Sequence, residues 1–175
     1  QNSSGVDSAF MQQAHDLGLN SMLIPESLGG LGLTAVDFIL LAEACGEVAL
    51  PEPLVESVMV TAPSLVDILD HGLGNADVQR VIDGVLAGEL RVALGHTINP
   101  HINYADSADW FLLPDGDGVY LLPKDAVTLE AKTSVDPSRR LFSVSFAASD
   151  AYLVADGDAG ASLQRASLNR GALAS

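Results

Sequence analysis

Apolar residues in the first half of the chain recur every three or four positions, the spacing that places side chains on one face of a helix. Thr34 and Asn75 are the expected N-caps, because their side chains can accept from the first free backbone N–H groups of a helix. The segment after Thr34 is apolar nearly all round, which is typical of a buried helix. The pattern predicts helices at Ser8–Leu19, Ala35–Val48, Val58–Leu69 (interrupted or started near Pro63) and Ala76–Ala87.

The second half changes to short apolar runs bounded by Gly, Pro, Asp and Asn, which predict strands. The tetrapeptide Asp115-Gly116-Asp117-Gly118 lies between two such runs and favours a tight hairpin turn with positive φ. A further helix is expected to begin near Ala159 and to be still running at Ser175, where the chain stops in mid-element. The predicted strands are Leu90–Leu94, Trp110–Leu113, Val119–Leu122, Val127–Leu129, Leu141–Phe146 and Tyr152–Val154.

This change of period predicts an α+β fold: an N-terminal helical bundle, then a small antiparallel β-barrel or sandwich, then the start of another helix. We expect the helical domain at residues 1–88 and the middle β-domain at residues 89–156. Residues 157–175 are expected to begin a C-terminal helical domain that is cut short.

Charge and composition narrow the class of protein. The 175 residues contain 8 Lys and Arg against 23 Asp and Glu, a net charge of −15. Residues 1–79 contain 11 of the acids and no base, and residues 80–175 contain the other 12 acids and all 8 bases. A chain this acidic is not expected to bind nucleic acid or an anionic membrane.

Cysteine content and the lack of targeting signals narrow the class of protein further. The single cysteine, Cys45, excludes an internal disulfide and a multi-cysteine zinc site, and no metal site is predicted. No apolar run approaches the ~20 residues that span a bilayer, and the N-terminus has no basic region typical of a signal peptide. We therefore expect a cytoplasmic protein.

Several motifs resemble one family. The loop Ile24-Pro25-Glu26-Ser27-Leu28-Gly29-Gly30-Leu31-Gly32 resembles the N-terminal signature of the acyl-CoA dehydrogenase superfamily, a Pro-Glu-x-x-Gly-Gly-x-Gly loop before a long helix. Glu43–Gly46 is similar to the end of that helix, Leu86–Leu94 to the start of its β-domain, and Arg170–Ser175 to the opening of its C-terminal helical domain. The resemblance covers almost the whole chain in the family's order.

Two further segments are similar to a divergent subgroup common in actinobacteria. They are Pro51-Glu52-Pro53-Leu54-Val55-Glu56-Ser57 and Asp136-Pro137-Ser138-Arg139-Arg140. Members of that subgroup often serve as partner subunits in heteromeric acyl-CoA dehydrogenases, including those acting on steroid side-chain CoA thioesters.

The resemblance implies a flavoprotein oxidoreductase of lipid or steroid side-chain metabolism, with FAD-dependent α,β-dehydrogenation of an acyl-CoA substrate. It also implies an oligomer: a homo-oligomer, or a heteromer with a second acyl-CoA dehydrogenase-like subunit. The family's Thr-Glu-Pro, Gly-Ser-Asp and Trp-x-(Thr/Ser) flavin motifs are missing at Leu94–His101 and after it, and its catalytic carboxylate lies beyond Ser175. We therefore name no catalytic residue.

Those departures leave alternatives open. One is a non-catalytic partner subunit without its own flavin and base, so FAD is bound by this chain or only together with a partner. Another is an unrelated helical-plus-barrel ligand-binding module. Whether the chain is itself an enzyme stays open at this point.

The candidate cofactor-binding residues are His96, Thr97, Asn99, Arg139 and Arg140. Thr97 lies where the resemblance places a flavin contact, and its hydroxyl can bond a flavin carbonyl or ring nitrogen. Adjacent guanidiniums can hold a pyrophosphate, and Arg139 and Arg140 are the strongest cationic spot of the chain. The competing interpretation of His96, Thr97 and Asn99 is a polar loop at a domain seam. For the two arginines it is a salt bridge to Asp136 or a subunit-interface pair.

The glycines of the signature loop could be mistaken for a dinucleotide-binding turn. Their spacing is not Gly-x-Gly-x-x-Gly, and no strand–helix unit surrounds them. We expect a tight loop that needs positive φ or close packing at Gly29, Gly30 and Gly32.

Overall fold

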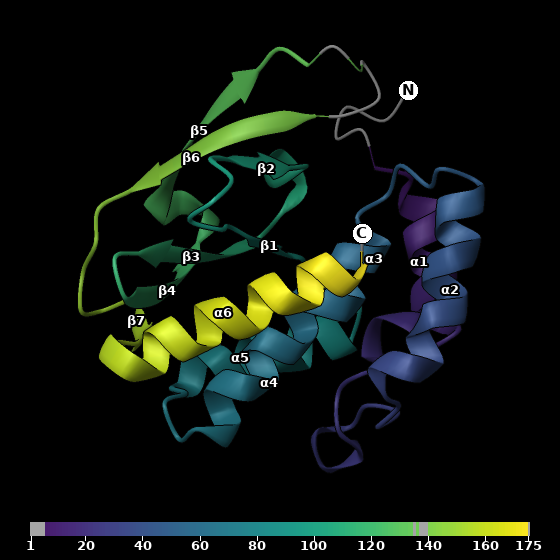
Figure 1. The fold of residues 1–175 in the computed structure, drawn as a ribbon, viewed down its shortest axis with the longest axis horizontal. Helices are drawn as coiled ribbons and strands as arrows, with labels where there is room; N and C mark the ends of the chain where they lie inside the picture. The colour runs from purple at the N-terminus through teal and green to yellow at the C-terminus, as the bar shows by residue number, and fades with distance from the viewer. Residues whose placement is uncertain (1–5, 135, 137–139, 175) are drawn as a thin grey trace.

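The computed structural model describes residues 6–134, 136 and 140–174. Within them, an N-terminal group of helices is followed by strands and then by one long helix, α6, which crosses the molecule (Figure 1). The α+β fold predicted from the sequence is confirmed. The helices are α1 (Ser8–Asp16), α2 (Ala35–Glu47), α3 (Leu54–Glu56), η3 (Ser57–Thr61), α4 (Ala62–Asp70), α5 (Ala76–Leu86) and α6 (Gly157–Ala174), with short 3₁₀ turns at Leu19–Ser21, Glu26–Leu28, Ala105–Ser107 and Lys124–Ala126.

Local capping explains where the helices begin. Asn75 Oδ1 accepts from the backbone N–H groups of Asp77 and Val78 at the start of α5, as predicted. Thr34 forms a capping box with Asp37 at the start of α2. α3, η3 and α4 follow one another without a break, and η3 is a π-helix. Pro63 lies in the first turn of α4 and has no N–H to donate, which fits the change of pitch just before it.

The strands form two sheets. One has the order β1-β3-β4-β7 and the other β2-β6-β5. Asp115 pairs with Gly118 across the β3–β4 turn, where Gly116 has φ 56°, as the first central residue of a type II′ turn requires. The strands are β1 (Val92–Leu94), β2 (His101–Asn103), β3 (Trp110–Asp115), β4 (Gly118–Pro123), β5 (Val127–Lys132), β6 (Leu141–Phe146) and β7 (Leu153–Ala155).

Alternate residues of β3 face the two cores. Trp110 and Leu112 belong to the large apolar cluster shared with the helices, while Phe111 and Leu113 belong to the cluster between the two sheets. The large cluster contains residues of α2 to α5 as well as of β1, β3, β4 and β7. The helical part and the first sheet are therefore packed on one continuous core.

The structure corrects three sequence expectations. α2 is not buried: Val36 and Leu40 are 72% and 74% exposed, and only Phe38 and Cys45 of this helix are buried. The sheets are not wholly antiparallel, because β1 pairs with β3 in parallel. The strand β2 was not predicted, since a three-residue run with two polar side chains has no recognisable apolar pattern.

The signature loop has the tight geometry that we expected. Gly29 and Gly32 have φ of 91° and 62°, in the left-handed region that favours glycine. A Cβ at Gly30 would overlap the backbone carbonyl of Ile24. The loop motif is thus explained by backbone conformation and close packing.

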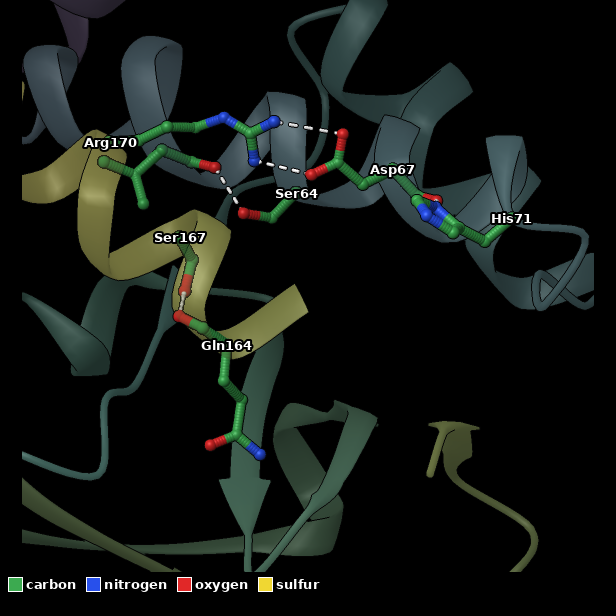
Figure 2. A network of polar contacts seen from close by, with 7 residues as sticks. Ser64, Asp67, His71, Gln164, Ser167 and Arg170 are labelled. Atoms are coloured by element: carbon green, nitrogen blue, oxygen red, sulfur yellow. Dashed lines mark hydrogen bonds and ion pairs between the residues drawn. The ribbon is translucent and has the colours of Figure 1, made fainter. Parts of the chain in front are cut away.

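α6 is fixed at three places along its length. Near its start, Gly160 packs so closely on Asp117 that a Cβ would overlap the Asp117 carbonyl oxygen. One turn later, Gln164 Nε2 donates to the carbonyl oxygens of Gly116 and Gly118 at 3.0 and 3.2 Å. Towards its end, Arg170 reaches Asp67 of α4 with both terminal nitrogens, at 2.7 and 3.0 Å (Figure 2). One helix therefore ties the β3–β4 hairpin to α4.

Candidate functional site

A large open cleft lies where the helices meet β1 and β2. Its volume is about 720 Å³, within the range of small-molecule sites. The end of α2, the Pro51–Pro53 segment and the α3–η3 helix form one wall; β1, β2 and the loop between them form the other; and Gly171 of α6 closes one side. The lining residues are Ala42, Cys45, Gly46, Ala49, Leu50, Pro51, Glu52, Pro53, Val55, Glu56, Val60, Leu94, His96, Asn99, His101, Ile102, Asn103, Tyr104, Asp136 and Gly171.

Unusual backbone geometry gathers at this cleft. Ala49 and Tyr104 have φ of 47° and 52°, and they are the two non-glycine residues with positive φ among those described. Both line the cleft, as does Val60 of the π-helix η3. Left-handed non-glycine residues and π-helical turns are costly and concentrate at functional sites. Their convergence on one cavity marks the cleft as the candidate site.

Two polar side chains stand at the inner end of the cleft. Glu56 and Asn103 line both the cleft and a small adjoining cavity of about 20 Å³, which we call the niche. Burial raises the pKa of Glu56 from its ordinary 4.5 to about 7. Asn103 Oδ1 is buried and has no hydrogen-bond partner within the described residues. A buried acceptor without a partner is rare in folded proteins and calls for a ligand or water.

The predicted residues of the β1–β2 loop separate into two groups. His96 and Asn99 line the cleft, together with His101. His96 is half-buried, which lowers its pKa, and Asn99 Oδ1 accepts from the backbone N–H of His101 at 3.1 Å. Thr97 is exposed and is outside the lining of the cleft.

The predicted arginine pair is described only in part. Arg140 forms an ion pair with Asp106, and its guanidinium lies 6.0 Å from the centre of the Phe142 ring. Its backbone carbonyl accepts from the N–H of Tyr104 at 2.8 Å, which attaches it to the end of β2 beside the cleft. Arg139 lies outside the described residues.

The cleft fits one part of FAD better than the other. Its lining combines apolar side chains with the polar side chains of His96 and Asn99, which can hydrogen-bond to a ring ligand. The diphosphate of FAD needs cationic or N–H donors. The charged lining residues are Glu52, Glu56 and Asp136, and the described lining contains no Lys or Arg. The described lining therefore offers hydrogen-bonding groups to the isoalloxazine ring and no Lys or Arg to the diphosphate.

Sequence reasoning missed Glu56 and Asn103 as site residues. Glu56 is the one acid between Leu54 and Val60, in an otherwise apolar helical run, and that isolation is a signal that could have marked it. Asn103 had no comparable signal, because its strand was not predicted.

Across residues 6–134, 136 and 140–174, no three or more His, Cys, Asp and Glu side chains are grouped so that they could hold a metal ion. None of the helices described there has both the length and the hydropathy that crossing a bilayer requires.

Comparison with solved structures shows the same fold in larger proteins. The ChsE4–ChsE5 complex from Mycobacterium tuberculosis matches with a TM-score of 0.71 and 20% identity, over 97% of this chain and 53% of that one. A variant of the Tcur3481–Tcur3483 steroid ACAD matches with a TM-score of 0.72 and 19% identity, over 99% and 55%. The electron transferring flavoprotein of Acidaminococcus fermentans matches with 0.74 and 16%, over 94% and 54%. The chain thus spans about half the length of these proteins.

Sequence comparison identifies the family. A search of curated protein sequences gives no match. The family described as acyl-CoA dehydrogenase, N-terminal domain, matches residues 1–89, which include the signature loop, the helices α1 to α5 and one wall of the cleft. This chain belongs to the acyl-CoA dehydrogenase family.

Proposed function

We propose that this chain is part of an acyl-CoA dehydrogenase subunit that acts in FAD-dependent α,β-dehydrogenation of an acyl-CoA thioester of lipid or steroid side-chain catabolism. The observation that carries the proposal is the cleft, on which two left-handed residues and a π-helix converge. Its volume of about 720 Å³ and its mixed apolar and polar lining suit an acyl chain beside a flavin ring. When bound, FAD supplies the hydride acceptor of the reaction.

The residues of this chain have positioning roles in the proposal. His96 and Asn99, with the predicted contacts Thr97, Arg139 and Arg140, would bind the cofactor from the β-domain side. The wall formed by α3 and η3 would hold the acyl chain and exclude water. No residue of this chain is assigned as the base that removes the α-proton.

We propose that a partner subunit completes the site. The described lining of the cleft offers no Lys or Arg for the FAD diphosphate, so Arg139 and Arg140 of this chain, groups of a partner, or both would supply the cations from outside it. Two of the similar solved structures are named as pairs of subunits. The partner in this proposal is a second acyl-CoA dehydrogenase-like subunit, and the complex is cytoplasmic.

The same observation favours a second candidate function. A cleft whose described lining offers no Lys or Arg to a diphosphate also suits a non-catalytic partner, one that stabilises a heteromeric dehydrogenase without its own flavin. The two candidates differ in whether the completed cleft of this chain holds flavin.

Visible absorption distinguishes them. The protein is purified alone and with the candidate partner subunit, and absorption in the flavin bands and acyl-CoA turnover are measured. We expect no flavin and no turnover from the chain alone, and one flavin more per complex than the partner binds by itself. A complex whose flavin content equals that of the partner alone would support the non-catalytic role. A colourless protein that binds no acyl-CoA with any partner would contradict both.

A further inference from the structure

The niche at the inner end of the cleft has the size of a single polar group. Its volume is about 20 Å³, close to what one water molecule occupies by the same measure. Pro53, Glu56, Asn103 and Tyr104 line both the niche and the cleft, so they form the passage between the two. A ligand in the cleft can therefore place one small substituent in the niche.

The hydrogen-bonding groups at this passage are complementary. Asn103 Oδ1 is a buried acceptor without a partner among the described residues. A protonated Glu56 carboxyl is a donor, and its raised pKa keeps a large fraction of it protonated at neutral pH. A hydroxyl group both accepts and donates one hydrogen bond, so it satisfies the two together. A carbonyl group accepts from Glu56 only and leaves Asn103 Oδ1 buried and unpaired.

No charged group around the niche takes over the role of Glu56 as the hydrogen-bond donor within the described residues. Arg91 lines the niche, but its guanidinium donates to Ser107 Oγ at 2.7 Å and lies in the field of Asp106 and Asp109. The other titratable residues that line the cleft are Glu52, His96, His101, Cys45, Asp136 and Tyr104, of which Tyr104 also lines the niche. The pKa of Glu56 is governed by burial, which is the environment that keeps a carboxyl neutral.

We propose that Glu56 and Asn103 recognise a hydroxyl substituent on the ligand of the cleft, and so select hydroxylated acyl groups. This inference rests on the proposed function for the identity of the ligand as an acyl-CoA. The recognition itself is a property of the niche and can be tested without CoA.

The test compares cyclohexanol with cyclohexanone, two rings of similar size that differ in the proton of the oxygen. Binding to the purified protein is measured at pH 6 by NMR titration, with the Asn103 side-chain amide as the reporter. We expect cyclohexanol to bind about 5- to 10-fold more tightly, the value of one net hydrogen bond, and to shift the Asn103 resonance. At pH 8, where Glu56 is mostly ionised and no longer donates, both rings should bind more weakly, and the alcohol preference should persist because the hydroxyl still donates to Asn103 Oδ1.

Variants assign the two hydrogen bonds to Asn103 and Glu56. Asn103→Leu should abolish the alcohol preference by removing the acceptor. Glu56→Leu should weaken the binding of both rings by removing the donor and leave the alcohol preference in place, whereas Glu56→Gln keeps a donor and should hold both affinities at both pH values. Glu52→Gln is the matched control, because Glu52 lines the cleft but not the niche, and it should leave both affinities and their ratio unchanged. Circular dichroism verifies that each variant is folded.

The outcomes separate this inference from the proposed function. Equal or tighter binding of the ketone, no detectable binding of either ring, or an unchanged ratio in Asn103→Leu would overturn the inference. Octanoyl-CoA and 8-hydroxyoctanoyl-CoA are then titrated into the complex with the partner subunit. If the alcohol preference holds and neither thioester binds, the proposed function fails while the niche assignment stands. If both thioesters bind and the rings show no preference, only the niche assignment fails.

Discussion

At the residue scale, the Glu56 carboxyl couples the stability of the fold to pH. Its pKa is about 7 in the folded protein and near 4.5 when exposed, so the folded state binds the proton more tightly. The stabilisation of the folded state by the protonated Glu56 carboxyl is complete below pH 4.5 and is lost as the pH rises through 7. We expect the free energy of unfolding to fall by up to about 3 kcal/mol across this window, from 1.36 kcal/mol per pKa unit.

Urea denaturation between pH 4.5 and 8 measures this effect, with Glu56→Gln as the variant that removes the titration. His96 acts in the opposite sense: its pKa is lowered by burial, so its stabilisation is present above pH 6.5 and is lost as pH falls. His96→Gln isolates that contribution. An identical pH profile in wild type and Glu56→Gln would contradict the prediction.

Gly30 and Gly46 allow a matched test of close packing. A Cβ at Gly30 would overlap the Ile24 carbonyl, whereas a Cβ at Gly46, inside α2, would meet no atom within 4 Å. Gly30→Ala should destabilise the fold by about 1–3 kcal/mol, the cost of overpacking. Gly46→Ala should stabilise it by roughly 0.5–1 kcal/mol, because alanine favours the helical backbone. The urea midpoints of the two variants measure these opposite shifts. Similar shifts in both variants would show that the structure moves to accommodate a Cβ at Gly30.

At the scale of elements, the Arg170–Asp67 pair fastens α6 to α4. The contact is bidentate, and the two side chains are only 25% and 23% exposed, so it is worth more than a surface ion pair. Arg170→Ala should cost about 1–3 kcal/mol of unfolding free energy, because Asp67 is left partly buried without its partner. Arg165→Ala, at an exposed site of the same helix, is the control. A double-mutant cycle with Asp67→Asn measures the coupling, and a coupling of zero would refute the fastening role.

The exposed apolar face of α2 is the surface on which we expect the partner subunit to pack. Val36, Ile39 and Leu40 are 72%, 51% and 74% exposed. Residues 1–79 have no base, so a second copy of this acidic half would be repelled, and a partner with basic groups around an apolar patch fits better. Leu40→Glu should weaken association with the partner at least tenfold, as measured by light scattering of the mixture. Leu17→Glu, equally exposed but outside α2, should have little effect.

Elements were predictable from the sequence where the cause is local. The cap at Asn75, the Gly116 turn and the crowding at Gly30 are all encoded within a few residues, and they were predicted. The parallel pairing of β1 with β3 and the exposure of α2 depend on which distant surfaces meet, so periodicity could not determine them. The candidate site shows the same division between local and long-range causes. His96 was predicted as a candidate from its place in the chain, whereas the raised pKa of Glu56 comes from burial, which arises only in the folded molecule.

At the scale of the whole molecule, the helices and the first sheet should unfold together, because one apolar core joins them. Trp110, the single tryptophan, packs in that shared core and carries the Arg80 guanidinium over its ring at 5.0 Å. Its fluorescence reports on β3 and α5 at once, while far-UV circular dichroism is dominated by the helices. The two urea transitions should coincide. Separated midpoints would show that the domains unfold independently.

The attachment of α6 has a consequence for ligand binding. The helix is held by the β3–β4 hairpin near one end and by α4 near the other, and Gly171 near its last turn lines the cleft. The side of the cleft that Gly171 lines is therefore in place before any ligand arrives. A ligand entering such a preorganised cavity does not have to supply the free energy of closing it, so more of its contact energy is available as affinity. Association should then proceed in one kinetic step, at a rate set by encounter and not by a slow conformational change.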